Sequence, residues 1–132
     1  MKTSEMLSSH PHPSEHQQAM VACIDACLAC VQCCTSCADA CLAETDPKAM
    51  ASCIRSDLDC VDVCAALARV LSRQTESTAT LQKALIEACI LSCETCGAIC
   101  RSHGSMHDHC KICGDTCAIC EKACEKLLSA MR

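Results

Sequence analysis

Cysteine residues recur along most of the chain at alternating steps of four and three residues. The longest run comprises Cys23, Cys27, Cys30, Cys34, Cys37 and Cys41. Two later runs repeat the spacing: Cys89, Cys93, Cys96 and Cys100, then Cys110, Cys113, Cys117, Cys120 and Cys124. This spacing places side chains on one face of an α-helix. Because no period-two alternation typical of strands occurs, the pattern predicts an all-α protein.

A fourth segment carries a thinner version of the same stripe. It holds Cys53, Cys60 and Cys64, and Asp57 occupies the position where the spacing would put another cysteine. Two interpretations of Asp57 stay open. It is either an oxygen ligand or hydrogen-bond partner within the cysteine stripe, or a solvated residue beside the acidic Asp59 and Asp62.

Short polar breaks separate these segments and predict helices over about 14–43, 47–72, 78–103 and 105–130. Ser14 and Gln17 have the spacing of a capping box, and Asp46 precedes a proline suited to a first helical turn. Gly104 suits the residue that follows a helix, and Ser105 opens the last helix. Residues 1–13 form a polar leader that we expect to belong to no core element.

Short connections make neighbouring helices antiparallel. We therefore expect residues 14–132 to form an up-down-up-down four-helix bundle with a cysteine-lined core. Folding at the breaks predicts four layers: Cys41, Cys53, Cys100 and Cys110; Cys37, Asp57, Cys96 and Cys113; Cys34, Cys60, Cys93 and Cys117; and Cys30, Cys64, Cys89 and Cys120.

The two ends of this bundle differ. One end is predicted to be plugged by Leu67, Leu71, Leu81, Leu85 and Leu127. The other carries the donor side chains Met50, His103, Met106, His107 and His109. Below Cys23, His16 and Met20 continue the stripe, either as a packed helix-end pair or as ligands.

An aliphatic stripe flanks the cysteines on the first two helices. It consists of Ile24, Leu28, Val31, Ala38 and Leu42, then Ile54, Leu58, Val61, Ala65 and Ala68. We expect these residues to pack the helices together. Any part of the stripe left exposed would serve as a subunit interface.

The composition excludes several classes of function and favours metal binding. The chain has 132 residues with 19 cysteines, no aromatic residue and a formal charge of −5. Proteins that bind nucleic acids usually have a basic face, so we expect no nucleic-acid partner. We expect no membrane span, since no apolar run approaches about 18 residues. The first residues lack the apolar region of a secretory signal, which favours the cytosol, where dense cysteines are more often metal-binding than disulfide-bonded.

The expected geometry also disfavours disulfides. Helix axes in a bundle lie about 8–10 Å apart, whereas the Cα atoms of bridged cysteines lie within about 7 Å. Two sulfurs joined through a metal ion, with bonds of about 2.3 Å, can span the larger gap. A nearly all-thiolate site selects Cu(I), zinc or an iron–sulfur cluster.

A continuous ladder of thiolates favours Cu(I). Structural zinc requires closed sets of four ligands, whereas near-equal numbers of Cu(I) ions and thiolates give an almost neutral core. The alternatives are a general heavy-metal or zinc buffer, and an iron–sulfur or redox protein. For the iron–sulfur cluster, the spacing of Cys27, Cys30, Cys33 and Cys37 resembles that of bacterial ferredoxins, although Ala38 replaces the usual proline. For redox chemistry or catalysis, Cys110 lies next to His109, but nineteen cysteines on a repeated spacing single out no catalytic thiol.

The cysteine ladders of residues 14–130 resemble those of the cytosolic copper storage proteins. The resemblance implies a non-enzymatic homotetramer that holds many Cu(I) ions per monomer, exchanges copper with donor or acceptor proteins, and loads through its histidine-bearing end. It implies that every cysteine except Cys33 is a ligand. The accessory ligands it leaves as candidates are Asp57, Cys33, His103, Met106, His107 and His109.

Overall fold

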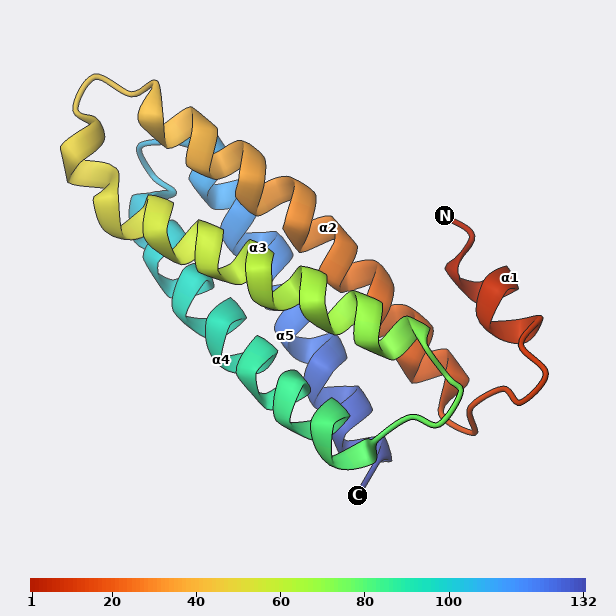
Figure 1. Cartoon of the computed structure of the whole chain (residues 1–132). Helices are drawn as coiled ribbons and strands as arrows, with labels where there is room; N and C mark the ends of the chain where they lie inside the picture. The colour runs from red at the N-terminus through yellow and green to blue at the C-terminus, as the bar shows by residue number, and fades with distance from the viewer.

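The computed structural model describes all 132 residues and contains helices without strands. Four long helices form the bundle: α2 (Gln17–Leu42), α3 (Ala51–Ser72), α4 (Ala79–His103) and α5 (Asp108–Ala130). They run alternately up and down, α2 packs against α3 and α5, and α4 completes the ring (Figure 1). This arrangement confirms the predicted all-α four-helix bundle with a cysteine-lined core.

The helix ends differ from the predicted ones. Helix α2 begins at Gln17, because Ser14 Oγ accepts a hydrogen bond from the backbone N–H of His16 at 3.0 Å instead of capping the helix. A short 3-10 helix, η1 (Pro47–Met50), precedes α3, and the Asp46 side chain makes no cap. Gly104 directly follows the end of α4, as predicted, but its φ of −63° is a right-handed conformation that is open to any residue. Helix α5 starts at Asp108 instead of near Ser105.

The first residues form a helix against the bundle, which the sequence did not predict. Helix α1 (Thr3–Ser8) lies beside the N-terminal part of α2 (Figure 1). Leu7 is only 6% exposed and belongs to the hydrophobic core. Thr3 Oγ1 donates to Asp25 Oδ1 at 2.6 Å, and Gln17 Nε2 donates to Ser8 Oγ at 2.6 Å. The expectation that residues 1–13 contribute nothing to the core is therefore wrong.

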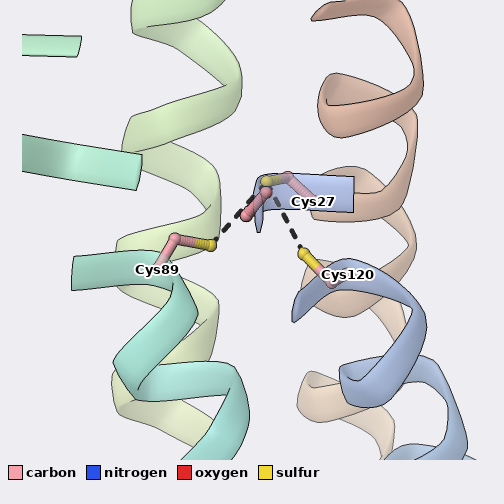
Figure 2. Close-up of side chains that lie close together, drawn as sticks. Cys27, Cys89 and Cys120 are labelled. Carbon is pink, nitrogen blue, oxygen red and sulfur yellow. Dashed lines mark hydrogen bonds between the residues drawn. The ribbon is translucent and has the colours of Figure 1, made fainter. Parts of the chain in front are cut away.

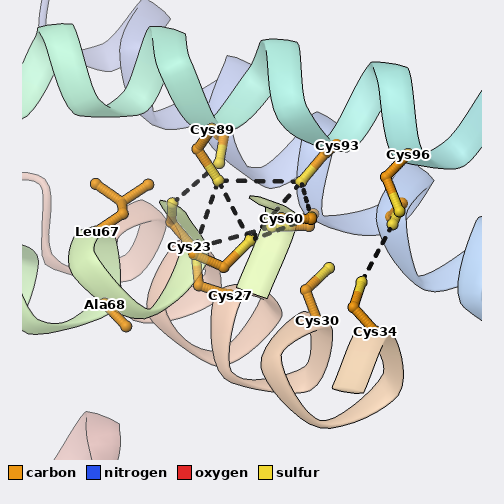
Figure 3. Packing of buried hydrophobic residues seen from close by; sticks show 14 of the residues in the cluster. Cys23, Cys27, Cys30, Cys34, Cys60, Leu67, Ala68, Cys89, Cys93 and Cys96 are labelled. Carbon is orange, nitrogen blue, oxygen red and sulfur yellow. Dashed lines mark hydrogen bonds between the residues drawn. The ribbon is translucent and has the colours of Figure 1, made fainter. Parts of the chain in front are cut away.

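The cysteine stripes of the four helices meet along the axis of the bundle (Figure 3). Every cysteine except Cys33 is at most 1% exposed, and we call this set the cysteine seam. Cys33 is half-buried and lies off the seam. Only part of the flanking stripe packs the helices together: Ile24 and Ala68 are buried, while Leu28 and Leu58 remain exposed.

The leucine plug is only partly as predicted. Leu67, Leu71 and Leu127 are fully buried, but Leu81 is 52% exposed. Gln82 and Ile86 are buried instead. The inward face of α4 therefore lies one position later along the chain than the sequence predicts.

Helix α2 is long and apolar enough to cross a membrane by length and composition, with a mean hydropathy of 1.7. This corrects the expectation that no segment reaches that length. Cysteine behaves as a small apolar residue. Every cysteine of α2 except Cys33 is buried in the core, so these residues raise the hydropathy of the helix although they face the interior of the bundle. The helix therefore has the character of a core helix.

Candidate metal centre

The seam places thiol groups at the separations that a shared metal ion requires. Cys27 Sγ lies 3.9 Å from Cys89 Sγ and 3.8 Å from Cys120 Sγ (Figure 2). Two sulfurs bound to one ion with bonds of about 2.3 Å lie about 3.8 Å apart at a tetrahedral angle and about 4.0 Å apart at a trigonal one. All nineteen cysteines are free. The core is therefore a set of reduced thiols with spacing close to that of metal coordination.

Sulfur atoms gather into overlapping groups of four. Within each group the donor atoms lie within 4.8 Å of one another. Four of these groups are Cys27, Cys89, Cys120 and Cys124; Cys30, Cys64, Cys93 and Cys120; Cys30, Cys34, Cys60 and Cys117; and Cys34, Cys96, Cys113 and Cys117. Because Cys30, Cys34, Cys117 and Cys120 each belong to two groups, the arrangement suits sulfur-bridged ions better than separate closed sites.

The predicted register holds. Cys53 Sγ lies 3.8 Å from Cys41 Sγ and 3.6 Å from Cys100 Sγ, which joins three helices in the outermost layer. Cys60 and Cys93 pair across one layer at 3.8 Å, as do Cys34 and Cys117. The groups of four straddle adjacent layers, because helical rise staggers the cysteines of neighbouring helices.

Asp57 lies fully buried among the thiols. Its Oδ1 accepts hydrogen bonds from Cys96 at 3.1 Å, Cys113 at 3.3 Å and Cys100 at 3.5 Å. Burial raises the pKa of Asp57 to about 9. The carboxyl group is therefore neutral at pH 7 in the metal-free protein, and the interpretation of Asp57 as a solvated residue is wrong.

At one end of the seam, His109 joins the outermost thiols. Its Nδ1 lies 3.4 Å from Cys37 Sγ and 3.6 Å from Cys110 Sγ, and these three residues form a potential metal site with Cys41. Burial raises the pKa values of Cys41 and Cys110, so these thiols stay protonated until a metal ion displaces the proton. The site thus combines one imidazole with three thiols.

Glu44 connects His109 to the surface, and sequence reasoning did not find it. Its Oε2 lies 3.3 Å from Nε2 of His109 and 2.5 Å from Nδ1 of His107. The two imidazole rings stack with their centroids 5.5 Å apart. Partial burial opposes the charge on His109, but hydrogen bonds to Cys37 and Glu44 outweigh it and raise the pKa of His109. Glu44 follows the end of α2, where no periodicity marks its role.

The other predicted accessory residues lie in different surroundings. His103 is half-buried, and its Nδ1 is a buried atom without a hydrogen-bond partner, as expected for a nitrogen able to accept a metal ion. Met106 is 67% exposed. Cys33 accepts a hydrogen bond from Thr116 Oγ1 at 3.6 Å on the outside of the seam, so the ferredoxin-like spacing does not bring four cysteines together.

The family of copper storage proteins matches residues 16–129. The copper storage protein Ccsp from Streptomyces lividans, loaded with 10 copper equivalents, is 43% identical, with 96% of this chain and 98% of that chain covered and a TM-score of 0.94. The cytosolic copper storage protein of the same organism with five coppers is 47% identical (86% and 95% covered, TM-score 0.85). No curated protein sequence matches. With this family match over nearly its whole length, the chain belongs to the copper storage protein family.

Proposed function

We propose that this protein is a non-enzymatic store that holds many Cu(I) ions on the thiolates of its seam. The overlap of the four-sulfur groups carries the proposal, because shared sulfurs allow one ion for nearly every thiolate. Each Cu(I) offsets the charge of one thiolate, so the loaded core stays close to neutral, as burial requires. We propose the cytosol as its location, since the similar Streptomyces lividans protein is a cytosolic one.

The proposed ligands are the cysteines of the seam. They are Cys23, Cys27, Cys30, Cys34, Cys37, Cys41, Cys53, Cys60, Cys64, Cys89, Cys93, Cys96, Cys100, Cys110, Cys113, Cys117, Cys120 and Cys124. Asp57 is the proposed oxygen partner within the seam. The proposed point of copper uptake is the histidine mouth, which we define as His103, Met106, His107 and His109. Its support is the position of His109 beside Cys37 and Cys110.

We also propose that the chain assembles as a homotetramer. Ile112 and Ile119 lie seven residues apart on one face of α5 and are 59% and 64% exposed, and adjoining exposed apolar side chains mark contact sites between proteins. Light scattering of the purified protein would give the mass of the assembly. A mass equal to that of one chain would refute the tetramer. The proposed storage function does not depend on this result.

An anaerobic titration with Cu(I) tests the storage function. We expect binding to continue beyond about ten ions per chain, because soft thiolates select Cu(I) and can bridge it. Since the chain lacks tryptophan and tyrosine, absorption by copper–thiolate bonds in the near ultraviolet can be followed without overlap. Saturation at one to four ions, or preferred retention of zinc in competition, would refute the proposal.

Two adjacent cysteines provide a matched pair for this titration. Cys34→Ser removes a sulfur that two groups of four share, so the copper capacity should fall. Cys33→Ser changes a half-buried residue off the seam, so the capacity should stay that of the unaltered protein. Equal losses in both variants would contradict the assignment of the seam as the store.

A further inference from the structure

A cavity opens at the end of the bundle opposite the histidine mouth. Its volume is about 560 Å³, and it lies between the segment before α2, the α3–α4 turn and the end of α5. In Figure 1 this is the end where α2 begins and the C-terminus lies. The residues of its lining that matter here are His12, His16, Met20, Gln74, Gln82 and Met131. Two imidazoles and two thioethers therefore surround one space.

The donor ladder of α2 continues from the seam into this cavity. Outward from Cys27, the buried residues Cys23 and Met20 follow on α2, and His16, the residue directly before the helix, lines the cavity; the steps are four, three and four residues. Residues at these steps lie about 5–6 Å apart between Cβ atoms. Exposure rises along the ladder, because Cys23 is 0% exposed, Met20 is 3% exposed and His16 is half-buried. Metal-binding side chains thus form an uninterrupted row from solvent to the thiols.

Met20 and Gln82, and not the leucines of the plug, form the inner lining of this cavity. Leu71 and Leu127 are fully buried on other helices and do not line the cavity, whereas Met20 and Gln82 do. Gln74 Nε2 donates a hydrogen bond to Met20 Sδ at 3.1 Å and another to the carbonyl oxygen of Leu71 at 2.8 Å. These contacts hold the thioether at the floor of the cavity, one helical turn from Cys23.

Beneath Met20, the seam begins with a pair of thiols. Cys23 Sγ lies 3.5 Å from Cys124 Sγ, and both residues are fully buried. Beyond Met20, an ion therefore meets the sulfur atoms of Cys23 and Cys124, which can bind it jointly. Thioether sulfur and imidazole nitrogen are soft, neutral donors suited to Cu(I), and they bind it more weakly than thiolates do. Such a site can pass an ion inward without retaining it.

We propose that Met20 and His16, with His12 and Met131 at the rim, form a second Cu(I) site through which copper enters or leaves the far end of the seam. The proposal rests on the proposed storage function. Transfer is a ligand exchange: the bond from Cu(I) to Met20 sulfur breaks, a bond to Cys23 sulfur forms, and the Cys23 thiol releases one proton to water in the cavity. Copper remains Cu(I) throughout.

The test measures loading after the histidine mouth has been weakened. The starting variant carries His103→Ala, His107→Ala and His109→Ala, and its initial rate of Cu(I) uptake from a chelated Cu(I) donor is recorded without oxygen. Adding His16→Ala and Met20→Leu should lower the initial rate of Cu(I) uptake of this variant about tenfold, because substitutions around a bound metal commonly weaken binding by at least that factor. Met20→Leu nearly conserves volume, so the fold is retained. His10→Ala is the matched control, because His10 does not line this cavity.

A second measurement places the ion directly. The fully loaded protein, whose thiolates are occupied, receives one further equivalent of Cu(I), and the methyl resonances of its methionines are followed by NMR. We expect the Met20 and Met131 signals to shift while that of Met6 stays fixed. Unchanged uptake in the Met20→Leu, His16→Ala variant together with unshifted methyl signals would overturn the second site. The storage function is tested separately by the Cu(I) titration, and it would be refuted if the unaltered protein saturated at a few ions.

Discussion

Glu44 Oε2 lies 3.3 Å from Nε2 of His109, while Nδ1 of the same ring lies 3.4 Å from Cys37 Sγ. A histidine that binds a metal through one ring nitrogen commonly donates its other N–H to a carboxylate, which fixes the tautomer and the orientation of the ring. Glu44 meets that description. It presents the lone pair of Nδ1 to the thiols at the histidine mouth.

Removing Glu44 should therefore change the tautomer of His109. In Glu44→Ala we expect loss of the tautomer protonated at Nε2, and copper uptake slower by about tenfold, with unchanged final capacity. Long-range proton–nitrogen NMR of the metal-free protein reports the tautomer. Glu94→Ala, which removes an exposed glutamate, is the control. An unaltered His109 spectrum in Glu44→Ala would contradict this role.

The three histidines at the mouth should affect the rate of loading more than its extent. Replacing His103, His107 and His109 with alanine should slow Cu(I) uptake from a chelated donor, because imidazoles that capture ions near the surface are lost. The final capacity should remain nearly the same, since the seam thiolates hold the store. If these histidines only cap and solvate the turn, stopped-flow absorbance will show unchanged rates.

Asp57 should make the metal-free protein less stable as the pH rises. Its pKa is about 9 in the folded chain against an ordinary value of 3.8, so between these values the folded protein keeps a proton that the unfolded chain releases. The free energy of unfolding should fall by up to about 1.4 kcal/mol per pH unit across this window. Asp57→Asn should remove that part of the slope in urea titrations, whereas the exposed Asp62→Asn should not. Identical slopes in wild type and Asp57→Asn would disprove the protonated carboxyl group.

Leu7 should hold α1 onto the bundle. Leu7→Ala deletes a side chain that is 6% exposed, so we expect about 2 kcal/mol of destabilisation and faster amide exchange in residues 3–8. Met6→Ala is a close control, since Met6 is 66% exposed. Equal exchange rates in the two variants would mean that α1 does not depend on this contact.

The metal-free chain should already be helical. Neutral thiols pack as small apolar groups, and Ile24, Leu67 and Leu127 are buried in the same core. Copper, by binding only the folded state, should then raise the melting temperature. A far-UV circular dichroism spectrum of a coil before loading would instead show that metal organises the bundle.

Periodicity was sufficient to predict the helices and the seam. The steps of four and three that link Cys23 to Cys41 define one helix face, and the short connections set which layers of neighbouring helices meet. Residues outside that periodicity could not be placed. Glu44 follows the end of a helix and contacts His109, which is distant in sequence. Helix α1 packs on the bundle through Leu7, and the surface that receives Leu7 forms only when the bundle folds. The phase of α4 also shifted, since Gln82 is buried where Leu81 was expected.

The sharing of Cys30, Cys34, Cys117 and Cys120 between neighbouring groups has a consequence for how copper fills the bundle. The first ion in a group leaves a bridging thiolate ionised and held in place, so the next ion meets a donor that is already preorganised. Filling should therefore be cooperative along the axis. When half of the total copper capacity is supplied, native mass spectrometry should find mainly chains that are nearly empty and chains that are nearly full. Copper in the cell would then be held by a fraction of fully loaded molecules and not be spread evenly over all of them.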